Sequence, residues 1–361
     1  MSIKLLTVKM NSLSTQFWRT DHFHFILTLT AVTLSALILI SAFYSKGINR
    51  AETSSSKVPR RLDIFFVETS GKSCLTFRQA CGIESAAKAN PDARIKLYTE
   101  KSTAGIINNL SPENDHREFF RCPVTSVLLK QMNNIEIVRE NLVELLQETP
   151  LWQLHKTGSF NRSSWRLFHL SDAARVALLW KKGGTYLDMD CIVLRPLESL
   201  NNTIGTVENG NVPSWVENGV MAFSAGHPFL HFLMKYMVLA FEPDNYISLG
   251  PDTLRDAMFY FCNRETLPAN HWVNCRHNSS IFIQPPESFY AINNSRMENF
   301  YQPEFDPNDW DLLHRDSFLS HIYGAGHGRI APPGSLYAEL ARKYCPVSYA
   351  MATAGGANGL F

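Results

Sequence analysis

The 361-residue chain carries almost no net charge, because 34 Lys and Arg residues offset 33 Asp and Glu residues and leave a formal charge of +1 at pH 7. It has no basic footprint and no acidic tail, so nothing in the composition supports nucleic-acid binding. Its seven cysteines lack the paired short spacings of a zinc site. An internal repeat is also absent. With 45% hydrophobic residues, the chain is long enough to form one well-packed folded domain.

The longest apolar run lies near the N-terminus. Residues 23–44 read FHFILTLTAVTLSALILISAFY, with one His and no formal charge, and about 20 apolar residues span a bilayer. The alternatives are a buried core helix and a cleaved signal peptide, but no small-residue cleavage site follows cleanly. The sequence therefore predicts a tail at 1–22, a transmembrane anchor at 23–44, a Ser-rich stem at 45–61 and a folded domain at 62–361.

Charged residues flank the apolar run on both sides, so they do not decide its orientation. Five N-glycosylation sequons all lie beyond it, at Asn109, Asn161, Asn201, Asn278 and Asn293. Together they favour a luminal location for the folded domain and a cytosolic one for the tail.

An oxidising lumen would pair some of the cysteines, and the odd count leaves at least one free. We expect Cys191 to be free, since it lies in an apolar stretch. We expect Cys262 to pair with Cys275, because these two bracket a loop-like segment. The remaining pairings stay open.

The folded domain begins with alternating strand-like and helix-like segments. Strands are predicted at 62–69, 93–99 and 135–138, and helices at 77–89, 124–132 and 142–155. This alternation predicts an α/β domain with a largely parallel sheet.

The next stretch, LSDAARVALLWKKGGTYLDMDCIVL at 170–194, contains two aspartates one residue apart in apolar surroundings. Ser171 is a suitable helix N-cap, and Gly183-Gly184 would end the helix after Lys182. The strand that follows would carry Tyr186, Asp188 and Asp190 on one face.

Simple geometry brings the acidic pair back to the start of this helix. The helix would rise about 18 Å, and the strand would return about 17 Å. Asp172 and Arg175, at i and i+3 on one helix face, would then meet Asp188 and Asp190 at the carboxyl edge of the sheet. A helix start there would favour phosphate. The sequence thus predicts a site for a divalent cation and a phosphorylated ligand.

An Asp-x-Asp pair by itself is weak evidence. A second one, Asp309 and Asp311, lies in a loop-like region and is expected to be a solvated turn or helix start. A structural alternative also exists for the first pair, in which the aspartates cap buried amides or neutralise Arg175 and Arg195.

The segment at 170–197 resembles the DXD-containing glycosyltransferases of the α-1,4-galactosyltransferase type, a family that includes α-1,4-N-acetylglucosaminyl- and N-acetylgalactosaminyltransferases. Further matching segments are FFVETS (65–70), IESAAKANP (83–91), NGVMAF (218–223), GPDTL (250–254) and RKYCP (342–346). The resemblance implies a type II Golgi membrane protein with a GT-A (Rossmann-like) nucleotide-sugar-binding fold, dependence on Mn²⁺ (or Mg²⁺) and a retaining mechanism.

The resemblance also implies roles for individual residues. Asp188 would face the ribose and the metal, and Asp190 would bind the metal, since carboxylate oxygens suit Mn²⁺ or Mg²⁺ beside a diphosphate. His321, in SHIYG, would be a third metal ligand or a diphosphate contact, although Tyr323 stands where the family has Trp; the alternative is a core or surface histidine. The donor nucleotide and sugar would contact Asp172, Arg175, Tyr186 and Gly184.

Three residues are candidates to face the anomeric carbon: Glu217, Asn218 and Asp252. The donor would be a UDP-sugar carrying Gal, GalNAc or GlcNAc. The acceptor would be a glycosphingolipid modified at the 4-position of its terminal sugar.

Two other functions are possible. An Asp-x-Asp phosphohydrolase would place the pair after the first strand of the domain, whereas here it lies deep in the chain. A catalytically silent, membrane-anchored sugar-binding or partner protein would have no need for the intact set of Asp172, Arg175, Asp188 and Asp190. Metal-dependent release of UDP distinguishes the enzyme from the silent protein.

Overall fold

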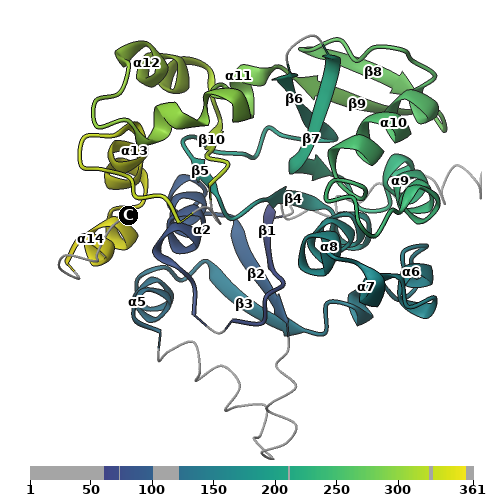
Figure 1. Ribbon diagram of the computed structural model, residues 1–361, viewed down its shortest axis with the longest axis horizontal. Helices are drawn as coiled ribbons and strands as arrows, with labels where there is room; N and C mark the ends of the chain where they lie inside the picture. The colour runs from purple at the N-terminus through teal and green to yellow at the C-terminus, as the bar shows by residue number, and fades with distance from the viewer. Residues whose placement is uncertain (1–60, 73, 101–121, 210–211, 325–327, 355–361) are drawn as a thin grey trace, which may run out of the picture. The chain divides into compact units, whose positions relative to one another are not determined.

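The computed structural model describes residues 61–72, 74–100, 122–209, 212–324 and 328–354 (Figure 1). The predicted tail and transmembrane anchor, almost all of the stem and the sequon at Asn109 lie outside these residues. Within the described part of the chain, no helix has the length and apolar character needed to cross a bilayer.

A mixed eight-stranded sheet forms the centre of the domain, in the order β3-β2-β1-β4-β7-β6-β9-β8. The strands are β1 (Asp63–Glu68), β2 (Arg94–Glu100), β3 (Ile135–Glu140), β4 (Gly184–Leu187), β6 (Thr203–Asn209), β7 (Val212–Phe223), β8 (His271–Cys275) and β9 (Ser279–Gln284). The pairs from β3 to β4 and the β6–β9 pair are parallel, whereas β4–β7, β6–β7 and β8–β9 are antiparallel. The predicted α/β class is confirmed, but a largely parallel sheet is correct only for the first half.

Helices cover both faces of this sheet (Figure 1). They are α2 (Phe77–Ala89), α5 (Pro123–Gln131), α6 (Trp152–Lys156), α7 (Ser159–Arg162), α8 (Arg166–Lys182), α9 (Pro228–Ala240), α10 (Pro251–Cys262), α11 (Pro286–Phe289), α12 (Pro307–Asp316), α13 (Leu336–Tyr344) and α14 (Pro346–Ala354), with 3₁₀ turns η2 (Glu144–Leu146) and η3 (Asn294–Tyr301).

Strand β1 shows why the sequence folds in this layered way. All six of its residues are buried. Phe65 and Val67 pack into the core on the α8 side, whereas Ile64 and Phe66 pack into the core on the α2 side. A strand with helices on both faces needs apolar residues at successive central positions, as at 64–67, because successive side chains point to opposite faces.

The predicted helix at 142–155 is wrong. The chain instead forms the short η2 turn and then α6. Pro150 has no N–H to donate to a continuing helix, and Glu148 just before it has a positive φ of 63°. The local sequence therefore ends one turn and starts another.

Helix α8 is longer than predicted. It begins at Arg166 after Trp165, so Ser171 lies inside the helix and is not its N-cap. The end after Lys182 is confirmed, and both Gly183 and Gly184 have positive φ. Asp172 is therefore about 9 Å along the axis from the helix start, and the predicted phosphate site at that start is wrong.

The acidic pair does not lie in one continuous strand either. Strand β4 ends at Leu187, and residues 188–190 turn the chain into β5 (Cys191–Val193), which pairs with β10 (Leu319–His321) in a separate two-stranded sheet. The turn is closed by the Cys191 N–H, which donates to the Asp188 carbonyl over 3.1 Å.

The two cysteine predictions are confirmed. Cys262 pairs with Cys275, and Cys191 is free and buried. The structure also forms Cys74–Cys122 and Cys81–Cys345, two pairs that the sequence left open.

Candidate functional site

The turn that carries the acidic pair lies at the carboxyl end of β4, beside the carboxyl end of β1. Its backbone is held from two sides. The Asp188 N–H donates to the Gly219 carbonyl of β7 over 2.8 Å, and the Asp190 carbonyl accepts from the Ile322 N–H over 3.0 Å. The carboxylates are thus positioned by strands from three distant parts of the chain.

Arg175 of α8 lies among these acidic groups. Its Nη2 is 3.2 Å from Asp172 Oδ1 and 3.2 Å from Asp188 Oδ1. Its guanidinium also lies over the ring of Tyr186, with the carbon 4.6 Å from the ring centroid. These distances confirm the prediction that Asp172, Arg175 and Asp188 lie close together.

Two further hydrogen bonds fix this group. The Tyr186 hydroxyl donates to Asp188 Oδ1 over 2.6 Å. Asn218 Nδ2 donates to Asp172 Oδ1 over 2.7 Å, while the Asn218 carbonyl accepts from Arg175 Nη1 over 3.0 Å. Since Asp172, Arg175 and Asn218 are all buried, these bonds compensate the cost of burying their polar atoms.

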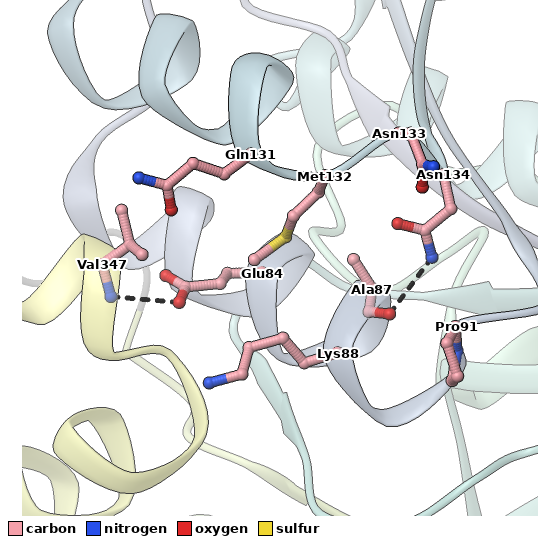
Figure 2. A pocket seen from close by; sticks show the side chains of 9 residues that line it. All are labelled: Glu84, Ala87, Lys88, Pro91, Gln131, Met132, Asn133, Asn134 and Val347. Carbon is pink, nitrogen blue, oxygen red and sulfur yellow. Dashed lines mark hydrogen bonds between the residues drawn. The ribbon is translucent and has the colours of Figure 1, made fainter.

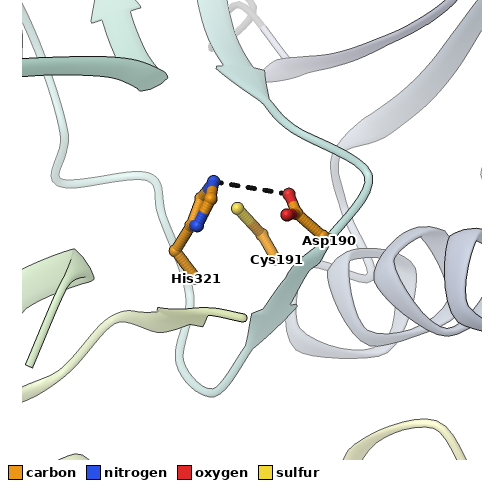
Figure 3. A group of neighbouring side chains, drawn as sticks. All are labelled: Asp190, Cys191 and His321. Atoms are coloured by element: carbon orange, nitrogen blue, oxygen red, sulfur yellow. Dashed lines mark ion pairs between the residues drawn. The ribbon is translucent and has the colours of Figure 1, made fainter. Parts of the chain in front are cut away.

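His321 points its ring toward the Asp190 carboxylate (Figure 3). Its Nε2 is 3.3 Å from Asp190 Oδ1 and 3.6 Å from Asp188 Oδ2. It is brought there by the pairing of β10 with β5, which places His321 opposite Cys191. His321 is buried, as the core-histidine alternative expects, and its ring also joins the acidic cluster.

The donor set at this point suits a divalent cation. One ligand atom each from Asp190, Cys191 and His321 lie within 4.8 Å of one another. His321 Nδ1 is buried and has no hydrogen-bond partner among the described residues. Two carboxylates and an imidazole suit Mn²⁺ or Mg²⁺ better than the buried thiol does. We therefore take Asp188, Asp190 and His321 as the candidate ligands.

The protonation states of His321, Asp188 and Asp190 depend on the burial of these side chains and on the ion pairs that they form. Burial opposes the charge on His321, but Asp190 and Asp188 outweigh it and raise its pKa to about 9. Burial would raise the pKa of Asp188, but Arg175 and His321 lower it. The pKa of Asp190 is raised by burial and by Asp188, against the effect of His321. Asp188 is thus held ionised in the absence of any ligand.

Strand β7 supplies two of the residues predicted to face the anomeric carbon. Asn218 points to Asp172, as described above, and the adjacent Glu217 points to the other face of the strand, the face on which Gly219 lies against Asp188 and His321. Burial raises the pKa of Glu217 to about 7, against the charge of His321, and Trp215 Nε1 donates to its Oε1 over 3.2 Å. Glu217 can therefore hold or release a proton near neutral pH.

Two predicted site residues are not brought to the cluster. Asp252, in the first turn of α10, is 34% exposed at its side chain and lies 3.8 Å from Arg255. Gly184 starts β4, at the opposite end of the strand from Asp188, and a Cβ there would lie 2.5 Å from the Asp63 carbonyl. Close packing against β1 thus explains Gly184.

The structure also tests the alternative role of the first acidic pair, in which it neutralises Arg175 and Arg195, and the expectation that the second pair is solvated. Arg195 donates to the carbonyls of His314 and Arg315 and not to the pair, so of the two arginines in this alternative Arg175 alone contacts the pair, at Asp188. Asp309 does lie in a helix start, in the first turn of α12, but it is buried and bound to Arg296 and Asn299, so the prediction of a solvated residue is wrong for it.

Gly219 is a site residue that the sequence did not single out. A Cβ at this position would lie 2.8 Å from Asp188 Oδ2 and 3.0 Å from His321 Nε2. Only glycine leaves room for the carboxylate and the imidazole to approach each other here. The sequence signal that could have identified Gly219 was its position directly after Glu217 and Asn218, which were predicted site residues.

A separate pocket of about 410 Å³ contains none of these residues (Figure 2). It lies beside α2, α5 and the start of α14, where the Glu84 carboxylate accepts hydrogen bonds from the backbone of Val347 and Ser348. Glu84 thus caps the start of α14, which is a structural role.

The fold and the cluster define an α/β protein with a candidate cation site at the carboxyl end of its central strands. A family model described as "Alpha 1,4-glycosyltransferase conserved region" matches residues 222–352. A second, described as "Glycosyltransferase sugar-binding region containing DXD motif", matches residues 76–209 and so covers the acidic pair.

Similar sequences agree with these models. The chain is 29% identical to mouse lactosylceramide 4-alpha-galactosyltransferase over 294 residues, which cover 80% of this chain and 75% of that protein. It is 25% identical to human alpha-1,4-N-acetylglucosaminyltransferase over 291 residues, 80% of each chain. The galactosyltransferase LgtC, solved with donor and acceptor sugar analogs, is 13% identical over 78% of this chain and 95% of its own, with a TM-score of 0.40.

The chain belongs to the α-1,4-glycosyltransferase family that carries the DXD motif, and it is a glycosyltransferase. Asp188-Met189-Asp190 is the motif in this chain. Its presence implies that the enzyme depends on a divalent cation.

Proposed function

We propose that the protein is a retaining enzyme with a GT-A domain that moves galactose or N-acetylgalactosamine from a UDP-sugar to a glycosphingolipid in α-1,4 linkage. The observation that carries this proposal is the joint placement of Asp188, Asp190, Arg175 and His321 at the carboxyl edge of the sheet. The name of one similar protein, a lactosylceramide 4-alpha-galactosyltransferase, supports galactose as the donor sugar and a glycosphingolipid as the acceptor. The predicted anchor at 23–44 and the predicted luminal sequons support a Golgi location as a type II membrane protein.

In this proposal Asp188, Asp190 and His321 hold Mn²⁺ or Mg²⁺, which would neutralise the diphosphate leaving group. Arg175 is held in place by its bonds to Asp172 and Asn218, and these three groups present hydrogen-bonding atoms to the donor sugar. Tyr186 orients Asp188 through its hydroxyl. Of the three residues predicted to face the anomeric carbon, Glu217 and Asn218 lie at the cluster, and the geometry favours them over Asp252.

The donor is identified by incubating the full-length protein in detergent with UDP-Gal, UDP-GalNAc or UDP-GlcNAc, Mn²⁺, and a glycosphingolipid ending in a β-linked hexose. We expect release of UDP and a new α-1,4-linked sugar with UDP-Gal or UDP-GalNAc. Transfer from UDP-GlcNAc alone would change the donor assignment. Failure to release UDP from any of the three would favour the catalytically silent partner protein.

The affinity for Mn²⁺ should rise with pH. In the metal-free protein His321, with a pKa of about 9, carries a proton at neutral pH, and this proton must leave before the ring can bind a cation. One released proton predicts a roughly tenfold gain in affinity per pH unit, from about pH 6.5 to about pH 8.5. Titration of Mn²⁺ followed by electron paramagnetic resonance measures this slope.

His321→Gln serves as the comparison, because it cannot release that proton. Its Mn²⁺ affinity should be weaker and should change little over the same range. His227→Gln, in a buried histidine at the start of α9, should keep the pH dependence of the unmodified protein. Equal slopes in all three proteins would remove His321 from the metal site.

A further inference from the structure

Three large aromatic side chains lie together on the surface beside the site. Trp165, Phe168 and Tyr246 are 40%, 51% and 48% exposed. Their rings meet edge to face, with centroids 6.0 Å apart for Trp165–Phe168, 5.3 Å for Trp165–Tyr246 and 5.1 Å for Phe168–Tyr246. Clustered exposed aromatic side chains mark a binding surface more often than isolated ones do. We call these three residues the aromatic platform.

The platform is held in place by hydrogen bonds between the start of α8 and the loop before α10. Trp165 Nε1 donates to the Asp244 carbonyl over 3.2 Å, and Ser164 Oγ donates to Asp244 Oδ1 over 2.7 Å. The buried ring of His169 bonds to Ser163 Oγ at 2.7 Å and to the Asn245 carbonyl at 3.0 Å. The platform is therefore preformed, which lowers the entropic cost of binding a ligand.

The platform continues directly from the acidic cluster. Phe168, Asp172 and Arg175 are at i, i+4 and i+7 of α8 and so share one stripe of the helix, with Phe168 about 6 Å along the axis from Asp172. Tyr246 leads into Gly250, where a Cβ would lie 3.5 Å from Asp172 Oδ2. Burial and then the charges of Asp172 and Asp188 raise the pKa of Tyr246.

We propose that Trp165, Phe168 and Tyr246 bind the acceptor saccharide by stacking against the C–H face of its terminal pyranose, beside the donor-sugar site. Ring faces carry negative charge density and attract the weakly positive C–H groups of a sugar. Asp172, one helical turn away, is assigned to the donor sugar, so the two sugars would lie side by side. This inference rests on the proposed function and assigns the acceptor subsite within it.

A lipid surface is the less favoured occupant. Membrane-binding surfaces combine apolar residues with an excess of Lys and Arg on the same face, whereas here the exposed Arg166 of α8 is accompanied by the exposed Glu242 and Asp244 of the loop that fastens the platform. The platform also lies beside the reacting centre, where a sugar must be placed for transfer.

The test uses full-length protein in detergent with lactose, a soluble β-galactoside, as the acceptor. Phe168→Ala and Trp165→Ala should each raise the acceptor KM about tenfold, which corresponds to the loss of one aromatic contact. The KM for the UDP-sugar and the rate of UDP-sugar hydrolysis without acceptor should change less than about twofold, since those report the donor site. Phe168→Tyr should restore the acceptor KM.

Trp272→Ala is the matched control, because Trp272 on β8 is 55% exposed but lies outside the platform. It should leave both KM values unchanged. Binding of lactose without any donor, followed by saturation-transfer NMR of the sugar protons, gives a readout that does not need turnover. It should weaken in Phe168→Ala and not in Trp272→Ala.

An unchanged acceptor KM together with unchanged lactose binding in Phe168→Ala and Trp165→Ala would overturn the proposal, even with transfer intact. Loss of binding to phosphatidylcholine vesicles, with lactose kinetics unchanged, would overturn it in favour of a lipid surface. If the unmodified protein binds lactose through these residues but transfers no sugar, the result supports saccharide binding by the platform and contradicts the proposed transferase reaction.

Discussion

Replacing Asp190 by Asn should lower sugar transfer by about a thousandfold or more while the protein stays folded. The carboxylate lies 3.3 Å from His321 Nε2 and is a candidate ligand of the divalent cation. Removing its charge removes the neutralisation of the diphosphate, which is worth several kcal/mol in the transition state. Radiolabelled sugar transfer from the productive UDP-sugar at saturating Mn²⁺ measures the loss.

The second Asp-x-Asp pair offers a matched control. Asp311 of α12 is exposed and is not among the residues of the acidic cluster, so Asp311→Asn should keep full activity. Far-ultraviolet circular dichroism and the melting temperature of Asp190→Asn should match those of the unmodified protein, since Asn has the same shape and the pKa of Asp190 is raised by burial. Activity in Asp190→Asn near that of the unmodified protein would show that the cation is held elsewhere.

Replacing Arg175 by Gln should destabilise the protein by about 3–5 kcal/mol, because it leaves buried carboxylates without their cation. Arg175 lies 3.2 Å from both Asp172 and Asp188 and is itself buried. Urea unfolding followed by tryptophan fluorescence measures the change. Arg315→Gln, which breaks a pair with Asp316 at an arginine 69% exposed, should cost less than about 1 kcal/mol.

A double-mutant cycle identifies the cause of that loss. Asp172→Asn removes one of the two carboxylates that lose Arg175, so adding it to Arg175→Gln should recover about 1–2 kcal/mol, although Asp172→Asn is destabilising alone. Strictly additive losses would show that Arg175 stabilises the protein by packing on Tyr186 and not by its charge.

Elements defined by a strong local pattern were predictable from the sequence. The prediction of α2 at 77–89 matches the helix Phe77–Ala89, where Thr76 and Gln79 form a capping box. Strand β1 is a continuous apolar run bounded by polar residues, so its position was equally clear. The helix predicted at 142–155 failed because Pro150 interrupts an otherwise helical pattern.

The end of α8 could be predicted from the sequence, whereas its start could not. Its end was clear, because Gly183 and Gly184 adopt positive φ. Its start was not, because Trp165 precedes the helix without a side-chain cap and Ser171 offered a better local signal. The start is set by packing against the loop at 242–248, which contacts Ser164, Trp165 and His169. Such contacts are invisible in the local sequence.

By itself, the sequence determined the acidic pair, the helix that carries Asp172 and Arg175 on one face, and their return to a common edge, because these features lie within 20 residues and follow from local chain geometry. Only the tertiary structure decided which groups complete the site. His321 reaches Asp188 because β10 pairs with β5, and Glu217, Asn218 and Gly219 reach it because β7 pairs with β4. Pairing between distant strands depends on the packing of the whole sheet, which no local pattern specifies.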